Sequence, residues 1–207
     1  MSDYNQQTLE SYDRTVTAFY EKSPQEVSGV LQTWIDDNLQ TLPTDARIIE
    51  IGTGTGKDAD YIESQGYTVE RTDASQGFID FLTDHGHQAR ELDVLTDDLG
   101  SDYDMVFANC VLLHFTREDT AMVMKKVFGA LTPGGRFAFV MKLGEGEEVS
   151  EDKLGAPRFF CYWQQDDLEE LVETTGFASC EVTYQPDYRT VNARAGTLLL
   201  TALKGEE

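Results

Sequence analysis

Residues 48–62 read IIEIGTGTGKDADYI: an apolar run, then Gly52, Gly54 and Gly56 at alternating positions, then a charged stretch with helical spacing. Glycines between a strand and a helix let the backbone pass close to a nucleotide, and the first turn of the helix offers unpaired N–H groups to an anion. The stretch therefore predicts a cofactor-binding loop, and the spacing of its glycines decides which cofactor fits.

Two well-known phosphate-binding loops fit this stretch poorly. The triphosphate loop, G-x-x-x-x-G-K-[ST], needs one more residue between its glycines and a hydroxyl where Asp58 stands, and a carboxylate there would repel phosphate. The dinucleotide loop, G-x-G-x-x-G, needs its third glycine where Lys57 stands. Asp73, at the end of the next expected strand, suits the ribose of either nucleotide class, so a nicotinamide-dependent oxidoreductase, using NAD(P), stays as an alternative.

The composition is that of a folded, strongly acidic domain. The 207 residues include 40% hydrophobic side chains, enough for one domain with a buried core. The net charge of −22 repels nucleic-acid phosphates, and no apolar run reaches the ~20 residues of a membrane span, so we expect a cytoplasmic protein without nucleic-acid or membrane partners. The three cysteines are widely spaced and form no C-x-x-C pair, which argues against a metal site.

Apolar residues recur with helical spacing at the start of the chain, and the pattern changes after Pro43. A second helix is expected from a capping box in which Ser23 is the N-cap, Pro24 lies in the first turn and Glu26 closes the box. Beyond Pro43, short apolar strands alternate with amphipathic helices, which predicts a parallel sheet covered by helices on both faces. The strands are expected at 47–51, 68–72, 88–91, 103–108 and 136–141, and the helices at 57–64, 76–85 and 117–131.

The C-terminal part follows a different pattern. A helix is expected at 166–175, and strands at 178–184 and 197–202 follow it with no helix between them. Two strands joined without a crossover helix are expected to pair antiparallel, at one edge of the sheet. Ser75 and Thr116 are the expected N-caps of the helices that follow them.

A third pattern, E/D-x-G-x-G-x-G with an acid about 20 residues later, matches the glycine loop without a gap. EIGTGTG at 50–56 together with Asp73 resembles this S-adenosylmethionine loop of class I methyltransferases. Further segments resemble the same family in order and spacing: ELDVLTDDL at 91–99, YDMVFANCVLLHF at 103–115 and ALTPGGRFAF at 130–139.

This resemblance implies a fold and a domain organisation. The fold is α/β, a Rossmann-like, doubly wound seven-stranded sheet that is mostly parallel, with strand order 3-2-1-4-5-7-6 and one antiparallel strand. Residues 1–207 form a single methyltransferase domain. Within it, an N-terminal helical extension at 1–42 covers the cofactor site, and 43–207 form the Rossmann-like core.

The resemblance also implies a cofactor and the residues that bind it. The cofactor is S-adenosyl-L-methionine, and the product is S-adenosyl-L-homocysteine. Asp73 would accept hydrogen bonds from the ribose hydroxyls, Asp93 would bind the adenine amino group, and Glu50 would support the loop from its strand. The residues expected to bind the cofactor are Glu50, Gly52, Thr53, Gly54, Asp58, Asp73, Ala74, Asp93, Val94 and Asn109.

A narrower resemblance reaches beyond the core motifs. Small bacterial and archaeal class I methyltransferases of mostly unassigned substrate share a GRD-like loop, an LLH turn and a K-x-G-x-G-E…R-[YF]-F stretch. VLLHF, MKLGEGEE and PRFF in this chain are similar to the last two of these features. In the loop, Lys57 replaces the usual Arg and Thr53 replaces the usual Cys, and a threonine hydroxyl fits the same small space.

Candidate residues for the methyl acceptor lie after the expected fourth strand and on the first helix. His114 is expected either to be a general base or to be a structural histidine. Lys142 and Arg158 bracket the acidic stretch GEGEEVSED, which is expected either to close over the substrate, with Arg158 binding an anionic group, or to be a mobile loop with surface salt bridges. Tyr12 and Tyr20 are expected to cover cofactor or substrate, or to pack in the core.

The predicted function is S-adenosylmethionine-dependent transfer of a methyl group to a small-molecule acceptor, by a monomer or homodimer. Because the sulfonium is already an activated electrophile, the protein mainly has to align the acceptor with the S–CH₃ bond. A non-catalytic S-adenosylmethionine-binding protein stands beside the oxidoreductase as the second alternative.

Overall fold

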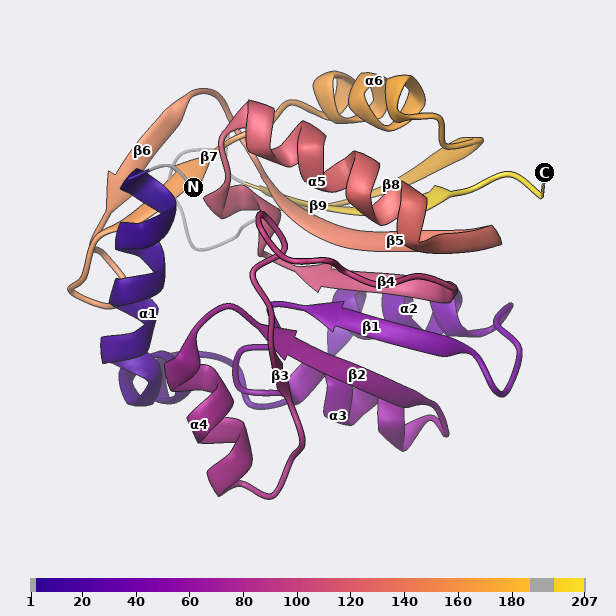
Figure 1. Ribbon diagram of the computed structural model, residues 1–207. Coiled ribbons are helices and arrows are strands. Elements are labelled where there is room, and N and C mark those ends of the chain that lie inside the picture. The colour runs from indigo at the N-terminus through magenta and orange to yellow at the C-terminus, as the bar shows by residue number, and fades with distance from the viewer. Residues whose placement is uncertain (1–2, 187–195, 207) are drawn as a thin grey trace.

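A seven-stranded sheet of order β3-β2-β1-β4-β5-β9-β8 forms the centre of the protein in the computed structural model, which describes residues 3–186 and 196–206 (Figure 1). The first five strands in this order pair in parallel, and β9 runs antiparallel between β5 and β8. The predicted fold class, strand order and single antiparallel strand are confirmed. The strands are β1 (Arg47–Ile51), β2 (Thr68–Asp73), β3 (Arg90–Glu91), β4 (Tyr103–Asn109), β5 (Leu131–Leu143), β8 (Ser179–Pro186) and β9 (Gly196–Leu203).

Helices cover both faces of this sheet because its central strands are apolar on both sides. In β4, Met105 and Phe107 belong to one apolar cluster with residues of α2 and α3, whereas Val106 and Ala108 belong to a second cluster with residues of α5 and α6. Side chains that alternate between two buried faces are typical of parallel sheets. The helices are α1 (Asp3–Lys22), α2 (Gly29–Leu39), α3 (Lys57–Ser64), α4 (Gln76–Asp84), α5 (Arg117–Ala130) and α6 (Gln165–Thr175), with a 3₁₀ turn η1 (Leu112–His114).

Two of the expected helix caps are confirmed and one is wrong. Thr116 Oγ1 accepts a hydrogen bond from Asp119 N at 3.1 Å, and the Ser75 side chain caps α4 in the same way. The expected cap at Ser23 does not form, because α1 extends to Lys22 and α2 starts only at Gly29. The Gln25 side chain donates to the carbonyl oxygens of Tyr20 and Ser23, so this segment closes α1 instead of opening α2.

The sheet differs from its sequence prediction at two strands. β5 begins five residues earlier than expected, since Leu131 already pairs with Tyr103 and the register shifts before Arg136. The TPGG stretch therefore lies in an irregularity of the strand and not in a turn. β3 consists of Arg90–Glu91 alone, shorter than the expected four residues.

A second, two-stranded sheet has no counterpart in the sequence prediction. β6 (Glu147–Ser150) pairs antiparallel with β7 (Arg158–Cys161), so part of the acidic GEGEEVSED stretch is a strand. Glu147 and Glu148 are exposed on β6, whereas all four residues of β7 are buried. A polar strand of this kind carries no apolar alternation by which it could be recognised.

α1 stands beside the carboxyl ends of β1, β2 and β4, where the arrowheads point towards it (Figure 1). It is fixed to β7 by side chains on its buried face. Ser11 Oγ donates to Pro157 O at 2.6 Å, Thr8 Oγ1 accepts from Phe159 N at 3.0 Å, and Tyr4 stacks on Phe159 with ring centroids 5.0 Å apart. α1 and the β6–β7 hairpin therefore form one wall at this end of the sheet.

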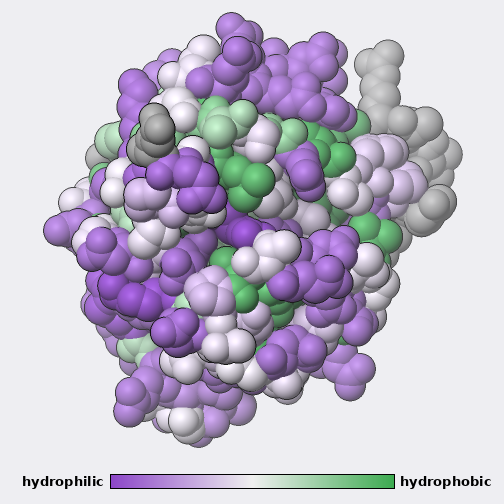
Figure 2. All heavy atoms as spheres, turned by 90° about the vertical axis from the view of Figure 1, so that its right-hand side faces the viewer, coloured by the Kyte–Doolittle hydropathy of each residue, from purple (hydrophilic) through white to green (hydrophobic). Residues whose placement is uncertain are grey.

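α2 lies elsewhere, against one face of the sheet. The Trp34 ring packs 5.7 Å from the Phe107 ring, and Trp34 Nε1 donates to Thr201 Oγ1 at 3.2 Å. The face of the protein turned away from α1 is largely hydrophilic, in keeping with the net charge of −22 (Figure 2). Among the described residues, no helix is both long and apolar enough to cross a membrane.

Replacing Ser11 with Ala should loosen α1 locally. The fully buried hydroxyl is the donor to Pro157 O, and its loss leaves that carbonyl without this partner, at a cost of about 1–3 kcal/mol. Hydrogen exchange should show faster opening of the α1 amides with unchanged protection of β4. Ser64→Ala is the matched control, because the exposed Ser64 hydroxyl bonds only locally, to Tyr61 O and to the Gln65 side chain. Equal protection of α1 in both variants would contradict this account.

Candidate functional site

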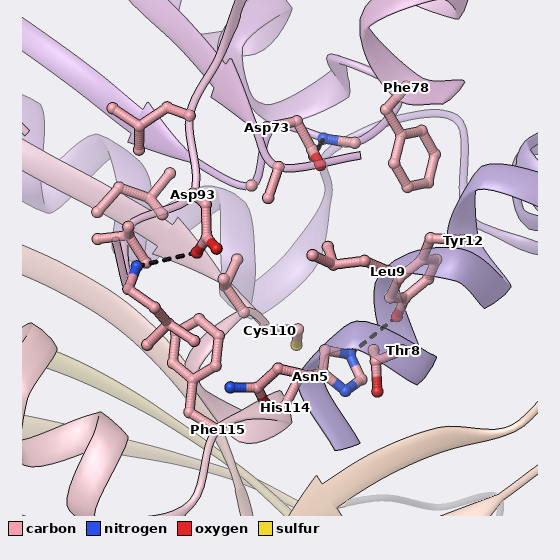
Figure 3. A pocket seen from close by; sticks show the side chains of 18 of the residues that line it. Asn5, Thr8, Leu9, Tyr12, Asp73, Phe78, Asp93, Cys110, His114 and Phe115 are labelled. Atoms are coloured by element: carbon pink, nitrogen blue, oxygen red, sulfur yellow. Dashed lines mark hydrogen bonds between the residues drawn. The ribbon is translucent and has the colours of Figure 1, made fainter. Parts of the chain in front are cut away.

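A cleft opens between α1 and the carboxyl ends of β1, β2 and β4 (Figure 3). Its empty space, counted out to the open mouth and so including open solvent, is about 740 Å³. Ligands of open α/β sheets bind beyond the carboxyl ends of the strands, so the cleft lies where the topology leads one to expect a site. α1 contributes to its lining, and α2 contributes none of the lining residues.

The glycine loop forms the floor of the cleft. Gly52 has a φ of 68°, and a Cβ atom at this position would lie 2.5 Å from Val111 Cγ2, so only glycine fits. Thr53 N donates to Thr72 O at 2.9 Å, and Thr72 Oγ1 donates to Glu50 O at 2.7 Å. These two bonds hold the loop against β2 and present its backbone to the cleft.

Asp73 ends β2 and holds the glycine loop from the side. Its Oδ2 accepts from Gly54 N at 2.8 Å, and its Oδ1 accepts from Ser75 N at 2.9 Å. Burial raises the pKa of Asp73 to about 6, although the backbone N–H donors oppose this shift. Each carboxylate oxygen can accept a further hydrogen bond, so Asp73 is an acceptor for two donors in the cleft.

Asp93 offers a second acceptor in the same cleft. Its Oδ1 accepts from Leu95 N at 2.9 Å, whereas its buried Oδ2 has no hydrogen-bond partner among the described residues. Apolar side chains of Leu92, Val94 and Leu95 line the cleft around it. A buried acceptor without a partner, set between apolar walls, suits a flat ligand that carries an amino group.

Three of the predicted cofactor residues, Glu50, Thr53 and Asp58, lie behind the loop and not on the cleft surface. Glu50 is hydrogen-bonded to Thr53 Oγ1, and burial together with the nearby Asp58 raises the pKa of Glu50 to about 8. Asp58 forms an ion pair with Lys57 and accepts from Asn109 Nδ2 at 2.8 Å. Of the residues in this hydrogen-bond network, Asn109 alone lines the cleft. Glu50, Thr53 and Asp58 support the glycine loop from the interior of the protein.

Tyr12 and His114 meet at the end of the cleft next to α1 (Figure 3). His114 Nδ1 lies 2.6 Å from Phe159 O, so the proton sits on Nδ1, because a carbonyl oxygen can only accept. The Tyr12 hydroxyl, 2.8 Å from Nε2, then donates to that nitrogen. Burial lowers the pKa of His114 to about 3 and raises the pKa of Tyr12, so both side chains are neutral at physiological pH.

The other three predicted acceptor residues do not line the cleft. Arg158 lies behind Tyr12 and donates from Nη1 to Tyr12 Oη at 3.4 Å. Lys142 Nζ lies 4.5 Å above the Phe160 ring. Tyr20 is 39% exposed and packs against Phe81, outside the cleft.

Sequence reasoning expected an N-terminal helical extension over the site, but of the α1 residues that form one wall of the cleft it named only Tyr12. Asn5, Thr8 and Leu9 line it together with Tyr12, and these four residues recur at three- and four-residue spacing on one helix face. Asn5 and Thr8 are buried although polar. Asn5 and Thr8 interrupt the otherwise apolar face of an amphipathic helix. This was the sequence signal that could have identified the wall of the cleft.

Cys110 also lines the cleft, and it stands directly after β4. Its side chain is accessible from the cleft, yet the surrounding protein raises the pKa of the thiol to about 11. A thiol that stays protonated at neutral pH is a weak nucleophile. Cys110 therefore contributes surface to the cleft and no covalent chemistry.

A profile of a family described as a methyltransferase domain matches residues 25–182. A search with the sequence found no match among curated proteins. The matched range includes the glycine loop, Asp73, Asp93 and His114, and it leaves out all of α1.

Solved structures share the fold at low sequence identity. Phosphoethanolamine N-methyltransferase 2 of Haemonchus contortus, in complex with phosphomonomethylethanolamine and S-adenosylhomocysteine, has a TM-score of 0.77 at 15% identity. The match covers 99% of this chain and 61% of that chain, so this chain spans less than two thirds of the length of the Haemonchus contortus enzyme. The 1,6-didemethyltoxoflavin-N1-methyltransferase of Burkholderia thailandensis, with 1,6-didemethyltoxoflavin and S-adenosylhomocysteine, has a TM-score of 0.67 at 18% identity, over 99% and 91% of the two chains. The CcbJ methyltransferase of Streptomyces caelestis has a TM-score of 0.68 at 17% identity, over 94% and 98%.

The buried, neutral state of His114 predicts a pH dependence of stability. Between its folded pKa of about 3 and the ordinary pKa of about 6.5, the unfolded chain binds a proton that the folded chain does not, so acidification below pH 6.5 favours unfolding. His114→Gln should remove up to about 1.4 kcal/mol per pH unit from this slope, measured by urea unfolding between pH 6.5 and 4.5. His85→Gln, at an exposed position after α4, should keep the wild-type slope. The same slope in both variants would refute a buried, neutral His114.

Proposed function

The chain belongs to the methyltransferase-domain family, and on this premise we propose that it transfers the methyl group of S-adenosylmethionine to a small-molecule acceptor. One observation carries this proposal: Asp73 and Asp93, predicted as ribose and adenine ligands, line the same cleft, and Asp93 Oδ2 has no partner among the described residues. When bound there, S-adenosylmethionine supplies an activated methyl group, and the protein has to position the acceptor in front of it.

The cofactor proposal assigns each part of the cleft a task. Asp73 accepts hydrogen bonds from the two ribose hydroxyls, Asp93 Oδ2 accepts from the adenine amino group, and Gly52 and Gly54 let the backbone approach the nucleoside. The start of α3 offers backbone N–H groups to the methionine carboxylate. The structural neighbours from Haemonchus contortus and Burkholderia thailandensis, which hold S-adenosylhomocysteine, support this cofactor.

A small acceptor is favoured by the way α1 closes the site. α1 is bonded to β7 through Ser11 and Thr8, and its residues form one side of the cleft, so a macromolecular substrate would have to displace the helix. Both ligand-bound neighbours hold small molecules next to S-adenosylhomocysteine, in agreement with this proposal. We also propose that the chain belongs to the narrower group with LLH and R-[YF]-F segments. The direct contact of the two segments, in which His114 donates to Phe159 O, supports this proposal.

Tyr12 and His114 provide a route for a proton that the acceptor loses. Tyr12 Oη can accept a hydrogen bond from an acceptor N–H or O–H while its own proton points to His114 Nε2. As the acceptor attacks the methyl group, its proton passes to Tyr12 Oη and the tyrosine proton passes to His114 Nε2. His114 acts through Tyr12 in this scheme, because the tyrosine hydroxyl occupies the imidazole lone pair.

The test of the proposal is a comparison of ligands and products. In titrations followed by intrinsic fluorescence, S-adenosylhomocysteine should bind with a dissociation constant on the order of micromolar, about −8 kcal/mol, and NADH should not bind. Tighter binding of NADH would revive the oxidoreductase alternative. Methylated products should then appear by mass spectrometry in a broad panel of small acceptors, and binding without any product would favour the non-catalytic alternative.

Asp73→Ala should weaken S-adenosylhomocysteine binding by roughly 1–3 kcal/mol, about 5- to 150-fold, because two ribose hydroxyls lose their acceptor. Calorimetric titration measures this change directly. Asp84→Ala, at the exposed end of α4, is the control and should bind like the wild type. An unchanged affinity of Asp73→Ala would remove the ribose assignment.

Tyr12→Phe should lower kcat by about 10²–10⁴ for an acceptor that must lose a proton, while S-adenosylhomocysteine affinity stays the same. The variant keeps the ring and removes only the hydroxyl that links the acceptor to His114. Tyr61→Phe, which removes a hydroxyl bonded to Asp36 on the other side of the sheet, should leave kcat unchanged. Equal kcat values for Tyr12→Phe and the wild type would exclude the proton route.

A further inference from the structure

Three cationic side chains gather around aromatic rings behind Tyr12 and His114. The Arg158 guanidinium lies 5.0 Å from the centre of the Phe160 ring and 5.7 Å from the centre of the Tyr12 ring. Lys142 Nζ lies 4.5 Å from the centre of the same Phe160 ring. Lys153 Nζ lies 4.2 Å from the centre of the Phe19 ring and donates to Ser23 Oγ at 2.7 Å. We refer to Arg158, Lys142 and Lys153 as the cation cluster.

No carboxylate among residues 3–186 and 196–206 lies within 4.0 Å of a nitrogen atom of the cation cluster. This is unexpected in a chain with 38 acidic and 16 basic residues. Arg71, a buried arginine elsewhere, pairs with both Asp60 and Glu63. In so acidic a protein, cations placed at random would have carboxylates nearby. The lack of carboxylate partners among the described residues is therefore a specific feature of the cation cluster.

Arg158 is the least satisfied member of the cluster. It is 5% exposed, its Nε has no partner in the described part of the chain, and its one hydrogen bond, to Tyr12 Oη, is long at 3.4 Å. An aromatic face compensates a cation by about 0.5–2 kcal/mol, well below the cost of burying an unpaired charge. A second cation, Lys142, above the same Phe160 ring adds repulsion. Within the described residues no carboxylate neutralises this positive charge, which leaves it available to an anionic ligand.

The charge of the cluster acts on residues that line the cleft. Arg158 and Lys142 both contribute, after burial, to the low pKa of His114. Lys142 is the main charge that opposes the raised pKa of Cys110, and Lys153 acts in the same direction. His114 and Cys110 line the end of the cleft opposite Asp93, so the positive potential reaches the end that the cofactor's adenine does not fill.

We propose that the methyl acceptor carries an oxyanion, a phosphate, phosphonate or carboxylate group, which binds beside Tyr12 at the end of the cleft. Neither Arg158 nor Lys142 lines the cleft, so the two cations attract this group through their positive potential. This inference rests on the proposed methyltransferase function and names the class of its substrate. Charges attract one another over several ångströms inside a protein, where screening is weaker than in water, so both cations favour an oxyanion at this end of the cleft. Lys153, held between Ser23 and Phe19, adds to the positive potential from the side of α1.

The proposal also gives the acceptor a part in its own activation. Neutralisation of Arg158 and Lys142 by the oxyanion removes two of the causes that lower the pKa of His114. His114 Nε2 thus becomes a better final base for the proton that passes through Tyr12. The relay is then strongest when an anionic acceptor is in place.

Binding of probe anions tests the proposal without any turnover. The protein is saturated with S-adenosylhomocysteine and titrated with inorganic phosphate or with acetate at constant ionic strength, with chloride as the reference. A higher affinity for phosphate than for acetate points to an acceptor with a phosphate or phosphonate group. A higher affinity for acetate points to an acceptor with a carboxylate group. In either case Arg158→Gln should weaken binding of the preferred anion by about 10- to 100-fold. Binding of neither anion, or equal binding by Arg158→Gln and the wild type, would overturn the proposal.

Two further variants guard against a folding defect in Arg158→Gln. Lys142→Gln removes a partly exposed cation and should also lose most of the anion response, with near-UV circular dichroism unchanged. Lys125→Gln, an exposed lysine on α5, is the matched control and should respond like the wild type. An equal loss in Lys125→Gln would show a non-specific charge effect and would overturn the proposal.

Paired acceptors separate this proposal from the proposed function. Each pair contains an amine or alcohol with a free phosphate or carboxylate group and the same compound with that group masked as a neutral ester. Faster methylation of the anionic compounds than of their neutral esters supports an oxyanion site. Methylation of the esters at equal or higher rates would overturn it while leaving the methyltransferase function intact. Failure of the methyltransferase function would instead show as absent S-adenosylhomocysteine binding, or as methylation of neither member of any pair.

Discussion

The carboxylate of Asp73 is the interaction on which the site depends. It joins the glycine loop after β1 to the start of α4, because one oxygen accepts from Gly54 N and the other from Ser75 N. Ser75 Oγ and Gly77 N in turn donate to Asp13 on α1, at 2.6 and 3.1 Å. The loop, α4 and α1 are thus linked through two carboxylates, the buried one of Asp73 and the exposed one of Asp13. Because α1 forms the acceptor side of the cleft, the same chain of bonds relates the two halves of the site.

The two ends of the cleft differ in their electrostatics. At the proposed cofactor end, the carboxylates have polar partners. Asp73 accepts hydrogen bonds from backbone N–H groups, and Asp58 pairs with Lys57 and accepts a hydrogen bond from Asn109. At the acceptor end, Arg158 and Lys142 have no carboxylate partner in the described residues and rest on aromatic rings. Uncompensated buried charge lowers stability, and such costs are common where function requires them. This contrast is the basis for the proposed anionic acceptor in a protein with a net charge of −22.

Much of the fold could be predicted because its signals are local. A strand, a glycine turn, a helix and an acid at the end of the next strand follow one another within about thirty residues, as in other βαβ units. The predicted start of α2 was wrong because the segment that begins at Ser23 closes α1. The Gln25 side chain donates to the carbonyl oxygens of Tyr20 and Ser23 there, and no local pattern reveals these bonds. The β6–β7 hairpin was missed because β6 is polar and exposed, and its pairing with β7 depends on burial that no local pattern reveals.

The sequence by itself determined the sheet, the glycine loop and the two acids, Asp73 and Asp93, that face one cleft. Each of these depends on spacing along the chain and on backbone rules that act over short distances. Only the tertiary structure decided the acceptor side. Tyr12 lies 102 residues from its partner His114 and 146 residues from Arg158, and both contacts form because α1 packs against β7. Packing of distant elements also decided that His114 is neutral and hydrogen-bonded to Tyr12, since burial and the Phe159 carbonyl fix its proton on Nδ1.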